Sequence, residues 1–241
     1  MKKAIVIGAS SGLGNEVARL LLDEGWRLGV AARRTSRLEE LKALNPEKVE
    51  VQTIDVTAED APQALEALIE KVGGMDLLFY ASGVGKQNME LEPDIELSTV
   101  ATNGMGFTRM IGMAYRYMAE HGGGHIAAIT SIAGTKGLGA APSYSATKAF
   151  QSTYLQSLEQ QANMRKLGIT FTDIRPGFVA TDLLGDDPKY PLLLEPKSVA
   201  REMVKAVNSR RHVRVIDWRW RCITALWRRI PRFIWRRLTV K

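Results

Sequence analysis

The sequence predicts an α/β fold in which helices cover both faces of a parallel sheet, the doubly wound arrangement. Three observations support this prediction. Apolar runs of strand length alternate with amphipathic helical patterns along most of the 241 residues. The apolar runs are nearly continuous, as expected for strands that are buried on both faces. The hydrophobic content of 45% can fill one sizeable core, and no repeat or linker divides the chain.

Each strand pattern is followed by a helical pattern, which predicts right-handed crossovers between parallel strands. Only residues 180–196 lack a regular pattern, because Gly185 and three prolines interrupt them. The predicted strands are residues 3–9, 27–32, 48–55, 76–82, 125–131, 168–176 and 212–217. The predicted helices are residues 14–25, 36–44, 61–72, 97–121, 143–168 and 196–207.

Several classes of protein are excluded by what the sequence lacks. The apolar run near the N-terminus is too short for a signal-peptide core, and no stretch of 18 apolar residues could span a membrane. The single cysteine, Cys222, allows no disulfide within the chain and suits a reducing, cytoplasmic compartment. No metal site is predicted, since His121, His125 and His212 have no metal-ligand spacing. A serine hydrolase is not predicted either, because the sequence has no Gly-x-Ser-x-Gly elbow.

A glycine-rich turn, "GASSGLG", joins the first predicted strand to the first predicted helix. Gly8, Gly12 and Gly14 allow a tight turn, close approach of the backbone to a pyrophosphate, and helix N-terminal amides that face the anion. An ordinary strand-to-helix turn does not need three glycines. The position and composition of this turn therefore favour a dinucleotide site.

The end of the second predicted strand indicates which dinucleotide is bound. An acid at this place would bind the ribose 2′-hydroxyl, whereas an arginine accommodates a 2′-phosphate. Here Ala32 stands in place of the acid, and Arg33 and Arg34 follow. Paired guanidiniums favour a phosphate, so we expect NADP(H) rather than NAD(H). Arg33 is the main candidate, and Arg34 either supports it or lies exposed at the surface.

Three residues between positions 131 and 148 have the chemistry of a proton-transfer site. Tyr144 and Lys148 are four residues apart on a predicted helix and therefore share one face, and Ser131 ends the strand before them. A tyrosine hydroxyl titrates near about 10, and a neighbouring ammonium would favour its phenolate. A serine hydroxyl can hold a substrate oxygen. Taken alone, however, the Tyr-x-x-x-Lys spacing usually means only a surface pair.

The motifs "GASSGLG", "ITSIAG", "SYSATK" and "RPGFVATD", in this order, make residues 3–217 resemble the short-chain dehydrogenase/reductase family. The resemblance implies a Rossmann domain with a seven-stranded parallel sheet. It implies that Tyr144 is the general acid/base, that Lys148 is its electrostatic partner and binds the nicotinamide ribose, and that Ser131 holds the substrate oxygen. Asn103 matches the asparagine that helps to hold a water molecule of the proton relay.

The resemblance also extends to the cofactor site. Asp55 and Val56 match the pair that contacts adenine, and Pro176, Gly177 and Thr181 match the segment along the nicotinamide and its phosphates. The full set of expected cofactor-binding residues is Gly8, Ser10, Ser11, Gly12, Leu13, Gly14, Arg33, Arg34, Asp55, Val56, Ala81, Gly83, Tyr144, Lys148, Pro176, Gly177 and Thr181.

The sequence departs from the family pattern in two places. Ile7 replaces the usual threonine before the glycine turn, and the segment 80–83, "YASG", replaces the usual Asn-Asn-Ala-Gly. Those asparagines mainly bind neighbouring strands and support the cofactor, while Ala81 and Gly83 still offer their backbone. Since Asn103 and the three residues of the proton-transfer site are intact, we expect an active enzyme. The alternative is a nucleotide-bound sensor or scaffold without turnover.

Residues 180–196 follow the sixth predicted strand and are therefore expected to form a lid over the substrate. Leucines and Tyr190 make this segment apolar, which predicts an apolar carbonyl or alcohol substrate. Asp182, Asp186 and Asp187 argue weakly against an anionic one.

The C-terminal residues 218–241 form an extension to the domain of residues 1–217. Residues 209–241 carry ten arginines and one lysine against one acid, a balance of +10, so residues 1–208, with 22 basic and 25 acidic side chains, carry −3. An amphipathic helix pair is predicted, with its apolar stripe formed by Ile223, Leu226, Trp227, Ile230, Ile234 and Leu238.

Two interpretations of this extension are compatible with each other. The stripe packs on the fold or on a second subunit, or the helices lie at an anionic membrane surface, such as the inner face of a cell membrane. A nucleic-acid-binding arm is not expected, because the apolar stripe fits an amphipathic helix better. A homodimer or homotetramer is expected from the resemblance alone.

Overall fold

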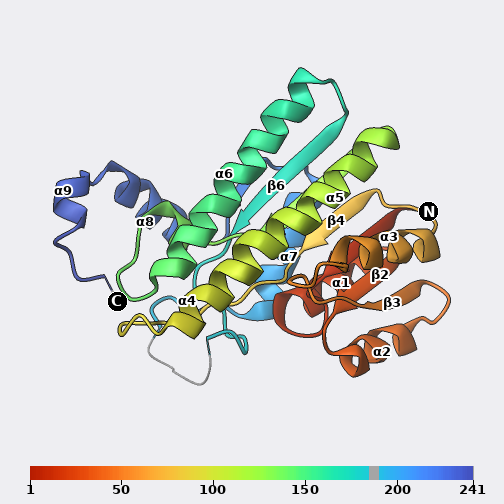
Figure 1. Ribbon diagram of the computed structural model, residues 1–241, viewed down its shortest axis with the longest axis horizontal. Helices are drawn as coiled ribbons and strands as arrows, with labels where there is room; N and C mark the ends of the chain where they lie inside the picture. Colours follow the sequence, from red (N-terminus) through yellow and green to blue (C-terminus); the bar gives the residue numbers. More distant parts are fainter. Residues whose placement is uncertain (185–189, 241) are drawn as a thin grey trace.

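The computed structural model describes residues 1–184 and 190–240, and its centre is a seven-stranded parallel sheet (Figure 1). The strand order is β3-β2-β1-β4-β5-β6-β7, and every neighbouring pair is parallel. The predicted doubly wound fold is thus confirmed. The strands are β1 (Lys3–Ile7), β2 (Arg27–Ala32), β3 (Val49–Thr53), β4 (Leu77–Tyr80), β5 (Gly124–Ile129), β6 (Ile169–Arg175) and β7 (Val213–Val215).

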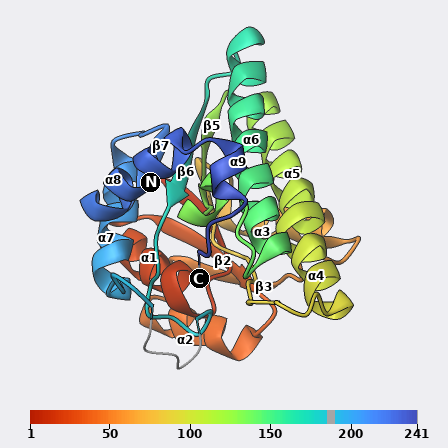
Figure 2. The same cartoon turned by 90° about the vertical axis from the view of Figure 1, so that its left-hand side faces the viewer.

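Helices cover both faces of the sheet (Figure 2). One face carries α1 (Gly12–Asp23), α2 (Thr35–Leu44) and α7 (Pro196–Asn208). The other carries α3 (Ala61–Val72), α4 (Pro93–Val100), α5 (Phe107–Glu120) and α6 (Pro142–Met164).

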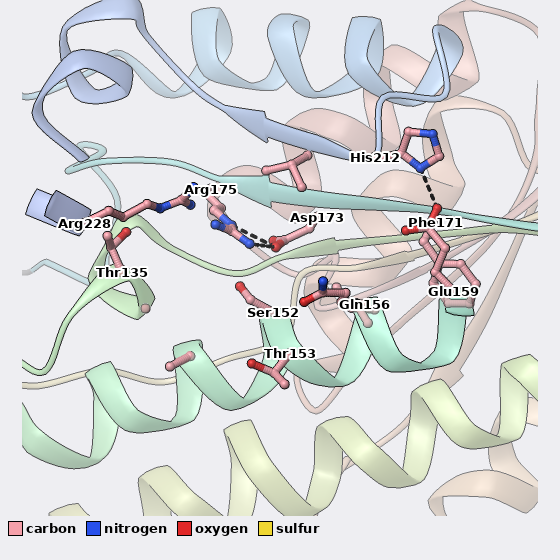
Figure 3. A pocket seen from close by; sticks show the side chains of 14 residues that line it. Thr135, Ser152, Thr153, Gln156, Glu159, Phe171, Asp173, Arg175, His212 and Arg228 are labelled. Atoms are coloured by element: carbon pink, nitrogen blue, oxygen red, sulfur yellow. Dashed lines mark hydrogen bonds and ion pairs between the residues drawn. The ribbon is translucent and has the colours of Figure 1, made fainter. Parts of the chain in front are cut away.

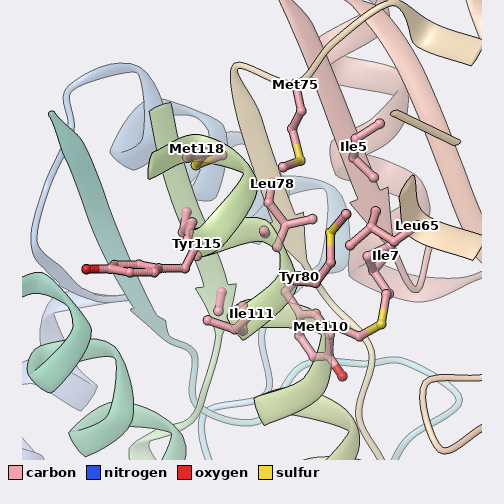
Figure 4. Close-up of a cluster of buried hydrophobic side chains, with 14 of the residues drawn as sticks. Ile5, Ile7, Leu65, Met75, Leu78, Tyr80, Met110, Ile111, Tyr115 and Met118 are labelled. Atoms are coloured by element: carbon pink, nitrogen blue, oxygen red, sulfur yellow. The ribbon is translucent and has the colours of Figure 1, made fainter. Parts of the chain in front are cut away.

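Alternate residues of each strand supply the cores on the two faces, because successive side chains of a strand point to opposite sides. In β1, Ala4 and Val6 join the core under α1 and α7, whereas Ile5 and Ile7 join the core under α3 and α5. Figure 4 shows the second core, in which Met110 lies near Ile7. Burial on both faces explains why the strand patterns are continuously apolar.

The long helix predicted at 97–121 begins earlier, at Pro93, and is not uniform. The segment η1 (Ala101–Gly106), which contains Asn103, is a π-helical turn between α4 and α5. Such turns widen a helix locally and often occur at functional sites. Gly106 lies so close to Val56 that an added Cβ would be 2.9 Å from Val56 O. The turn thereby places Asn103 where the carboxyl ends of the central strands meet.

The C-terminal extension is helical, as predicted. It consists of α8 (Trp218–Arg229) and α9 (Arg232–Trp235), separated by Pro231, whose ring cannot continue a helix. The Asp217 carboxylate accepts the Arg219 amide at 2.8 Å and so caps the start of α8. Among the described helices, none is both long and apolar enough to cross a membrane.

Candidate active site

The structure brings Ser131, Tyr144 and Lys148 together beyond the carboxyl end of β5. Ser131 begins the short 3-10 helix η2 (Ile132–Thr135), and its hydroxyl accepts the Ala133 amide at 3.1 Å. Tyr144 and Lys148 lie on the first turns of α6. Gly134 allows η2 to pack directly on α6, since an added Cβ would be 2.7 Å from the Lys148 carbonyl carbon. The face of α6 that carries Tyr144 and Lys148 therefore lies against the end of β5, where Ser131 stands.

A buried glutamine, Gln151, links Lys148 to Asn103. The Lys148 ammonium donates to Gln151 Oε1 at 3.0 Å and to the Ile129 carbonyl at 3.1 Å. Gln151 Nε2 in turn donates to the Asn103 carbonyl at 2.9 Å, and the Gln151 side chain is fully buried. The sequence reasoning missed this residue, although Gln151 follows Tyr144 by seven positions and so lies on the same helix face.

Asn103 also fixes the loop after β4. Its side-chain oxygen accepts the Val84 amide at 3.0 Å, and its side-chain nitrogen donates to the Val84 carbonyl at 2.7 Å. The loop then passes over Tyr144 so closely that a Cβ added to Gly85 would be 2.6 Å from the tyrosine ring. A Cβ added to Gly83 would lie 3.3 Å from Asn103 Oδ1 and 3.5 Å from Lys148 Nζ. Small residues in this loop therefore let it approach the site.

Burial dominates the electrostatics of the pair. Burial raises the pKa of Tyr144 above its ordinary value, and the Ser131 hydroxyl opposes this in part. Burial lowers the pKa of Lys148 to about 8, while the charge of Asp173 acts in the opposite direction. That the Lys148 ammonium favours the Tyr144 phenolate stays a prediction.

The glycine turn has the geometry of an anion cradle. Gly8 has φ +89°, and a Cβ there would be 2.6 Å from the Ser82 amide nitrogen. A Cβ on Gly14 would be 2.2 Å from the Gly8 carbonyl oxygen. Ser11 stands at the N-cap of α1 but does not cap it, so the first amides of the helix are left for a ligand. These residues fit the phosphates of a dinucleotide.

The two arginines after β2 lie near this cradle. Arg34 donates to the hydroxyls of Ser10 and Ser11, at 3.3 and 2.6 Å. Arg33 is exposed and acts on Asp55, whose pKa is lowered first by the Thr57 amide and also by the Arg33 charge. Arg34 therefore contacts the glycine turn directly, and the roles of the two arginines in cofactor binding stay predictions.

The remaining predicted cofactor residues border the same edge of the sheet. Thr181 lies across from the glycine turn, its methyl group 3.5 Å from a Cβ added to Gly12. Ala81 lies beside Gly14, with the two Cβ positions 3.0 Å apart. The Pro176 carbonyl accepts the Ile132 amide at 3.1 Å, which ties the end of β6 to η2. Leu13 is half-buried in the first turn of α1.

The segment after β6 is anchored at both of its ends. The Ala180 amide donates to the Leu194 carbonyl at 3.0 Å, and the Leu194 amide donates to the Phe178 carbonyl at 2.9 Å. Tyr190 stacks obliquely on Phe178, with ring centroids 4.6 Å apart. Asp186 and Asp187, which we used to argue about substrate charge, lie outside the described residues.

The C-terminal extension forms the outer wall of the site. Trp220 packs on Gly177, where an added Cβ would be 2.2 Å from the indole nitrogen, and it meets the Phe178 ring edge-on at 5.6 Å. Farther along, the Trp235 indole donates to the Gly137 carbonyl at 2.8 Å, and the Lys136 ammonium donates to the Ile230 carbonyl at 2.9 Å.

The docked face of α8 differs from the predicted stripe. Trp220 and Thr224 are buried and Ile223 and Trp227 are half-buried, whereas Leu226, placed in the stripe, is 64% exposed. Ile234 and Leu238 are exposed as well. The orientation of the helix is set by the contact between Trp220 and Gly177, which lie 43 positions apart in the sequence.

A groove of about 550 Å³ is lined in part by Gly134 and Thr135 of η2 (Figure 3). It runs between α6 and strands β6 and β7, and Arg228 of α8 reaches its rim. Asp173, buried at its floor, accepts hydrogen bonds from Arg175 and Thr130. The groove thus shares Asp173 with the electrostatics of Lys148 but contains none of the predicted site residues. Within the described residues, no group of three metal-ligating side chains is assembled.

Comparison with known proteins identifies the family. Residues 2–190 match the model of the short chain dehydrogenases. The chain belongs to the short-chain dehydrogenase family. It is 35% identical to an uncharacterized oxidoreductase of Myxococcus xanthus over 216 residues, which cover 86% of this chain and 83% of the relative. The expected enzyme class, a short-chain dehydrogenase/reductase, is confirmed by this membership.

Solved structures of such enzymes have the same fold. A variant of actinorhodin polyketide ketoreductase, described with NADPH, has a TM-score of 0.77 and 27% identity, covering 89% of this chain and 95% of that one. A 3-ketoacyl-(acyl-carrier-protein) reductase of Brucella melitensis, described with NADH, has a TM-score of 0.79 and 20% identity, with coverages of 90% and 96%. Nicotinamide dinucleotides of both kinds thus occur among the structural neighbours.

Proposed function

We propose that this protein is an NADP(H)-dependent oxidoreductase that interconverts an apolar carbonyl compound and its alcohol. The observation that carries the proposal is the meeting of Ser131, Tyr144 and Lys148 beside the glycine cradle of α1. The nicotinamide, when bound, supplies or accepts the hydride. Residues 1–217 form the catalytic domain in this proposal, and residues 218–241 close it from outside.

Tyr144 and Ser131 act on the substrate oxygen. In the reducing direction, the Tyr144 hydroxyl gives its proton to the carbonyl oxygen as hydride arrives at the carbon. The Ser131 hydroxyl donates a hydrogen bond to the same oxygen and so fixes its place. Because burial raises the pKa of Tyr144, proton release needs a neighbouring group that favours the phenolate.

Lys148, Gln151 and Asn103 support the proton transfer. The Lys148 ammonium stabilises the phenolate that Tyr144 becomes after giving up its proton. Gln151 holds this ammonium from one side, and the Ile129 carbonyl holds it from another. The resemblance suggests that a bound water links Lys148 to Asn103. In this chain the Gln151 side chain makes that link by hydrogen bonds to the Lys148 ammonium and the Asn103 carbonyl.

The cofactor preference rests on Arg33 and Arg34. Both follow the end of β2, where a ribose 2′-phosphate would need positive charge, and the Arg34 guanidinium donates to Ser10 and Ser11. Asp55 and Val56 border the adenine side. We expect Arg34→Ala to weaken NADPH binding at least tenfold more than NADH binding. Fluorescence titration of both cofactors measures this, and an equal loss for the two would overturn the preference.

Exposed apolar side chains support the proposals of an apolar substrate and of a homodimer or homotetramer. Leu183 and Leu193, in the segment predicted to form the lid, are exposed, and this apolar surface favours an apolar substrate. The outer face of α4, η1 and α6 exposes Leu97, Met105 and Phe150, which suits contact with a second copy in a homodimer or homotetramer. The lone, exposed Cys222 fits a cytoplasmic setting.

The test compares turnover in two tyrosine variants of the same helix. Wild type, Tyr144→Phe and the control Tyr154→Phe are given NADPH and a panel of apolar ketones, and NADPH oxidation is followed by absorbance. We expect Tyr144→Phe to lose at least a hundredfold in kcat while NADPH affinity and the Tyr154→Phe rate stay close to wild type. Equal rates in all three proteins, or NADPH binding without turnover of any ketone, would contradict the proposal.

A further inference from the structure

The outward face of α8 is apolar as well as basic, although the helix is already docked by its other face. Trp220, Ile223, Thr224 and Trp227 point toward the domain. On the opposite side, Trp218 is 67% exposed and Leu226 is 64% exposed. A helix that covers a soluble domain ordinarily turns polar residues outward. The outward face of α8 therefore has apolar surface that packing on this chain does not explain.

The exposed apolar surface continues beyond α8. Phe233 in α9 is 66% exposed, and Ile234 and Leu238 are also exposed. We call Trp218, Leu226, Phe233, Ile234 and Leu238, together with the arginines around them, the tail surface. These arginines are Arg221, Arg229, Arg232, Arg236 and Arg237, all of them exposed.

The charge of the tail surface is of one sign. Residues 218–241 contain seven arginines and no acid, whereas residues 1–208 carry a slight negative charge. Among the described residues, the ion pairs of these arginines are limited to Arg219 with Asp217. The described part of the domain thus does not neutralise this positive charge, which is exposed to solvent.

The tail surface lies next to the loop that leads into α6, the helix that carries Tyr144. Trp235 contacts Gly137, and the same loop reaches the segment after β4, where the Asn88 amide donates to the Ala140 carbonyl at 2.8 Å. That segment exposes Met89 and Leu91. Figure 1 shows the chain after α9 close to this loop. Exposed apolar side chains therefore continue from the tail to the segment after β4, in which Gly85 lies against the Tyr144 ring.

We propose that the tail surface docks the protein onto an anionic lipid membrane, with the opening of the active site next to the lipid. Tryptophan and phenylalanine side chains fit the headgroup level, and leucine and isoleucine fit the outer acyl region. Arginines around them bind anionic headgroups. An apolar substrate dissolved in the membrane would then have a short path to Tyr144, a consequence that rests on the proposed function.

Other occupants fit the tail surface less well. A second copy paired through this surface would bring two strongly positive tails together, which like-charge repulsion disfavours. Single-stranded nucleic acid would use the arginines and the aromatic rings but not Leu226, Ile234 and Leu238. Those aliphatic side chains need a partner with a hydrocarbon phase, which a lipid bilayer supplies.

Flotation of the full-length protein with vesicles tests the proposal. Vesicles of phosphatidylcholine alone are compared with vesicles that also contain phosphatidylglycerol, at low and high salt. We expect binding to the anionic vesicles only, with partial loss at high salt because the headgroup charges are screened. The Leu226→Ser/Phe233→Ser variant should bind at least about tenfold more weakly.

Matched variants separate the tail surface from general effects of charge and polarity. Met164→Ser removes an exposed apolar side chain at the far end of α6, and Lys197→Gln/Lys205→Gln removes two charges from α7. Both should bind vesicles like wild type, whereas Arg229→Gln/Arg236→Gln should bind roughly tenfold more weakly. Turnover of a water-soluble ketone should be unchanged in every variant, so vesicle binding is measured independently of the proposed reaction.

Three outcomes would overturn the proposal. The first is equal binding to neutral and anionic vesicles, or to neither. The second is unchanged vesicle binding by the two tail variants. The third is that the protein does not bind the vesicles but uses the tail surface to form a dimer or to bind single-stranded DNA.

Discussion

Two walls border the site at Tyr144, and they differ in composition and in origin. The inner wall, on α6 and η1, presents a buried polar network of Lys148, Gln151 and Asn103. The outer wall, formed by α8 and α9, presents tryptophans that follow one another as Trp220, Trp227 and Trp235, with ring centroids 6.4 and 5.5 Å apart. The difference suggests a division of labour, in which the inner wall governs the chemical step and the outer wall governs stability and access.

The largest effect is expected at the outer wall, in Trp220→Ala. This indole is 3% exposed and fills the space above Gly177, so its loss leaves a cavity. We expect the free energy of unfolding to fall by about 3 to 5 kcal/mol, as for other large-to-small changes in cores. Urea unfolding measures this.

Trp218→Ala is the matched control, because Trp218 lies on the same helix but is 67% exposed. It should change the free energy of unfolding by less than about 0.5 kcal/mol. Similar losses in the two variants would show that α8 is not held by its Trp220 face, and the idea of an outer wall would fail.

The next effect is expected where the loop after β4 touches the inner wall. In Gly85→Ala, the new methyl group would lie 2.6 Å from the Tyr144 ring, so either the ring or the loop must move. We expect kcat to fall roughly a hundredfold, since a displacement of about 1 Å at a reacting group can have that cost. Gly139→Ala, which meets nothing within 4 Å, should keep the wild-type rate. A wild-type kcat in Gly85→Ala would show that Tyr144 tolerates displacement.

The two walls also differ in how far the sequence predicts them. Tyr144 and Lys148 are four positions apart on one helix, so the inner wall follows from local spacing, and Gln151 could have been found on the same face. The contact between Trp220 and Gly177 joins two distant segments, and no local pattern shows which side of α8 faces inward. The sequence therefore groups Leu226 with Trp227 in one apolar stripe, whereas the structure exposes Leu226 and half-buries Trp227.

The burial of Tyr144 and Lys148 is a second feature that the sequence does not show. The spacing of Tyr144 and Lys148 shows that they are neighbours, but the degree of desolvation depends on the loops that cover them. These loops, held by Asn103 and approaching through Gly85, remove water from both groups. This burial raises the pKa of Tyr144 above its ordinary value.

A smaller effect at the inner wall is expected in Gln151→Leu. Gln151 Oε1 accepts a hydrogen bond from the Lys148 ammonium and so favours the charged form. Without this acceptor the pKa of Lys148, already lowered to about 8 by burial, should fall further. Activity that needs the ammonium should then decline at a lower pH than in wild type, with a loss of about tenfold at the optimum.

The pH profile of kcat measures this effect, with Gln156→Leu as the control on the same helix. A rate loss in Gln151→Leu without a shift of the alkaline limb would mean that Gln151 acts only through packing.

The smallest effect is expected in Trp235→Phe, which keeps an aromatic ring beside Trp227 and Lys136 but removes the indole donor. That donor reaches the Gly137 carbonyl at 2.8 Å and is a direct link between the outer wall and the loop before α6. Its loss should lower the free energy of unfolding by about 1 kcal/mol. Trp227→Phe makes the same change of ring in a side chain that donates no hydrogen bond to the described residues, so urea unfolding should show a smaller loss there. Equal losses in the two variants would mean that ring size alone holds the outer wall, and that the hydrogen bond to Gly137 adds nothing to its attachment.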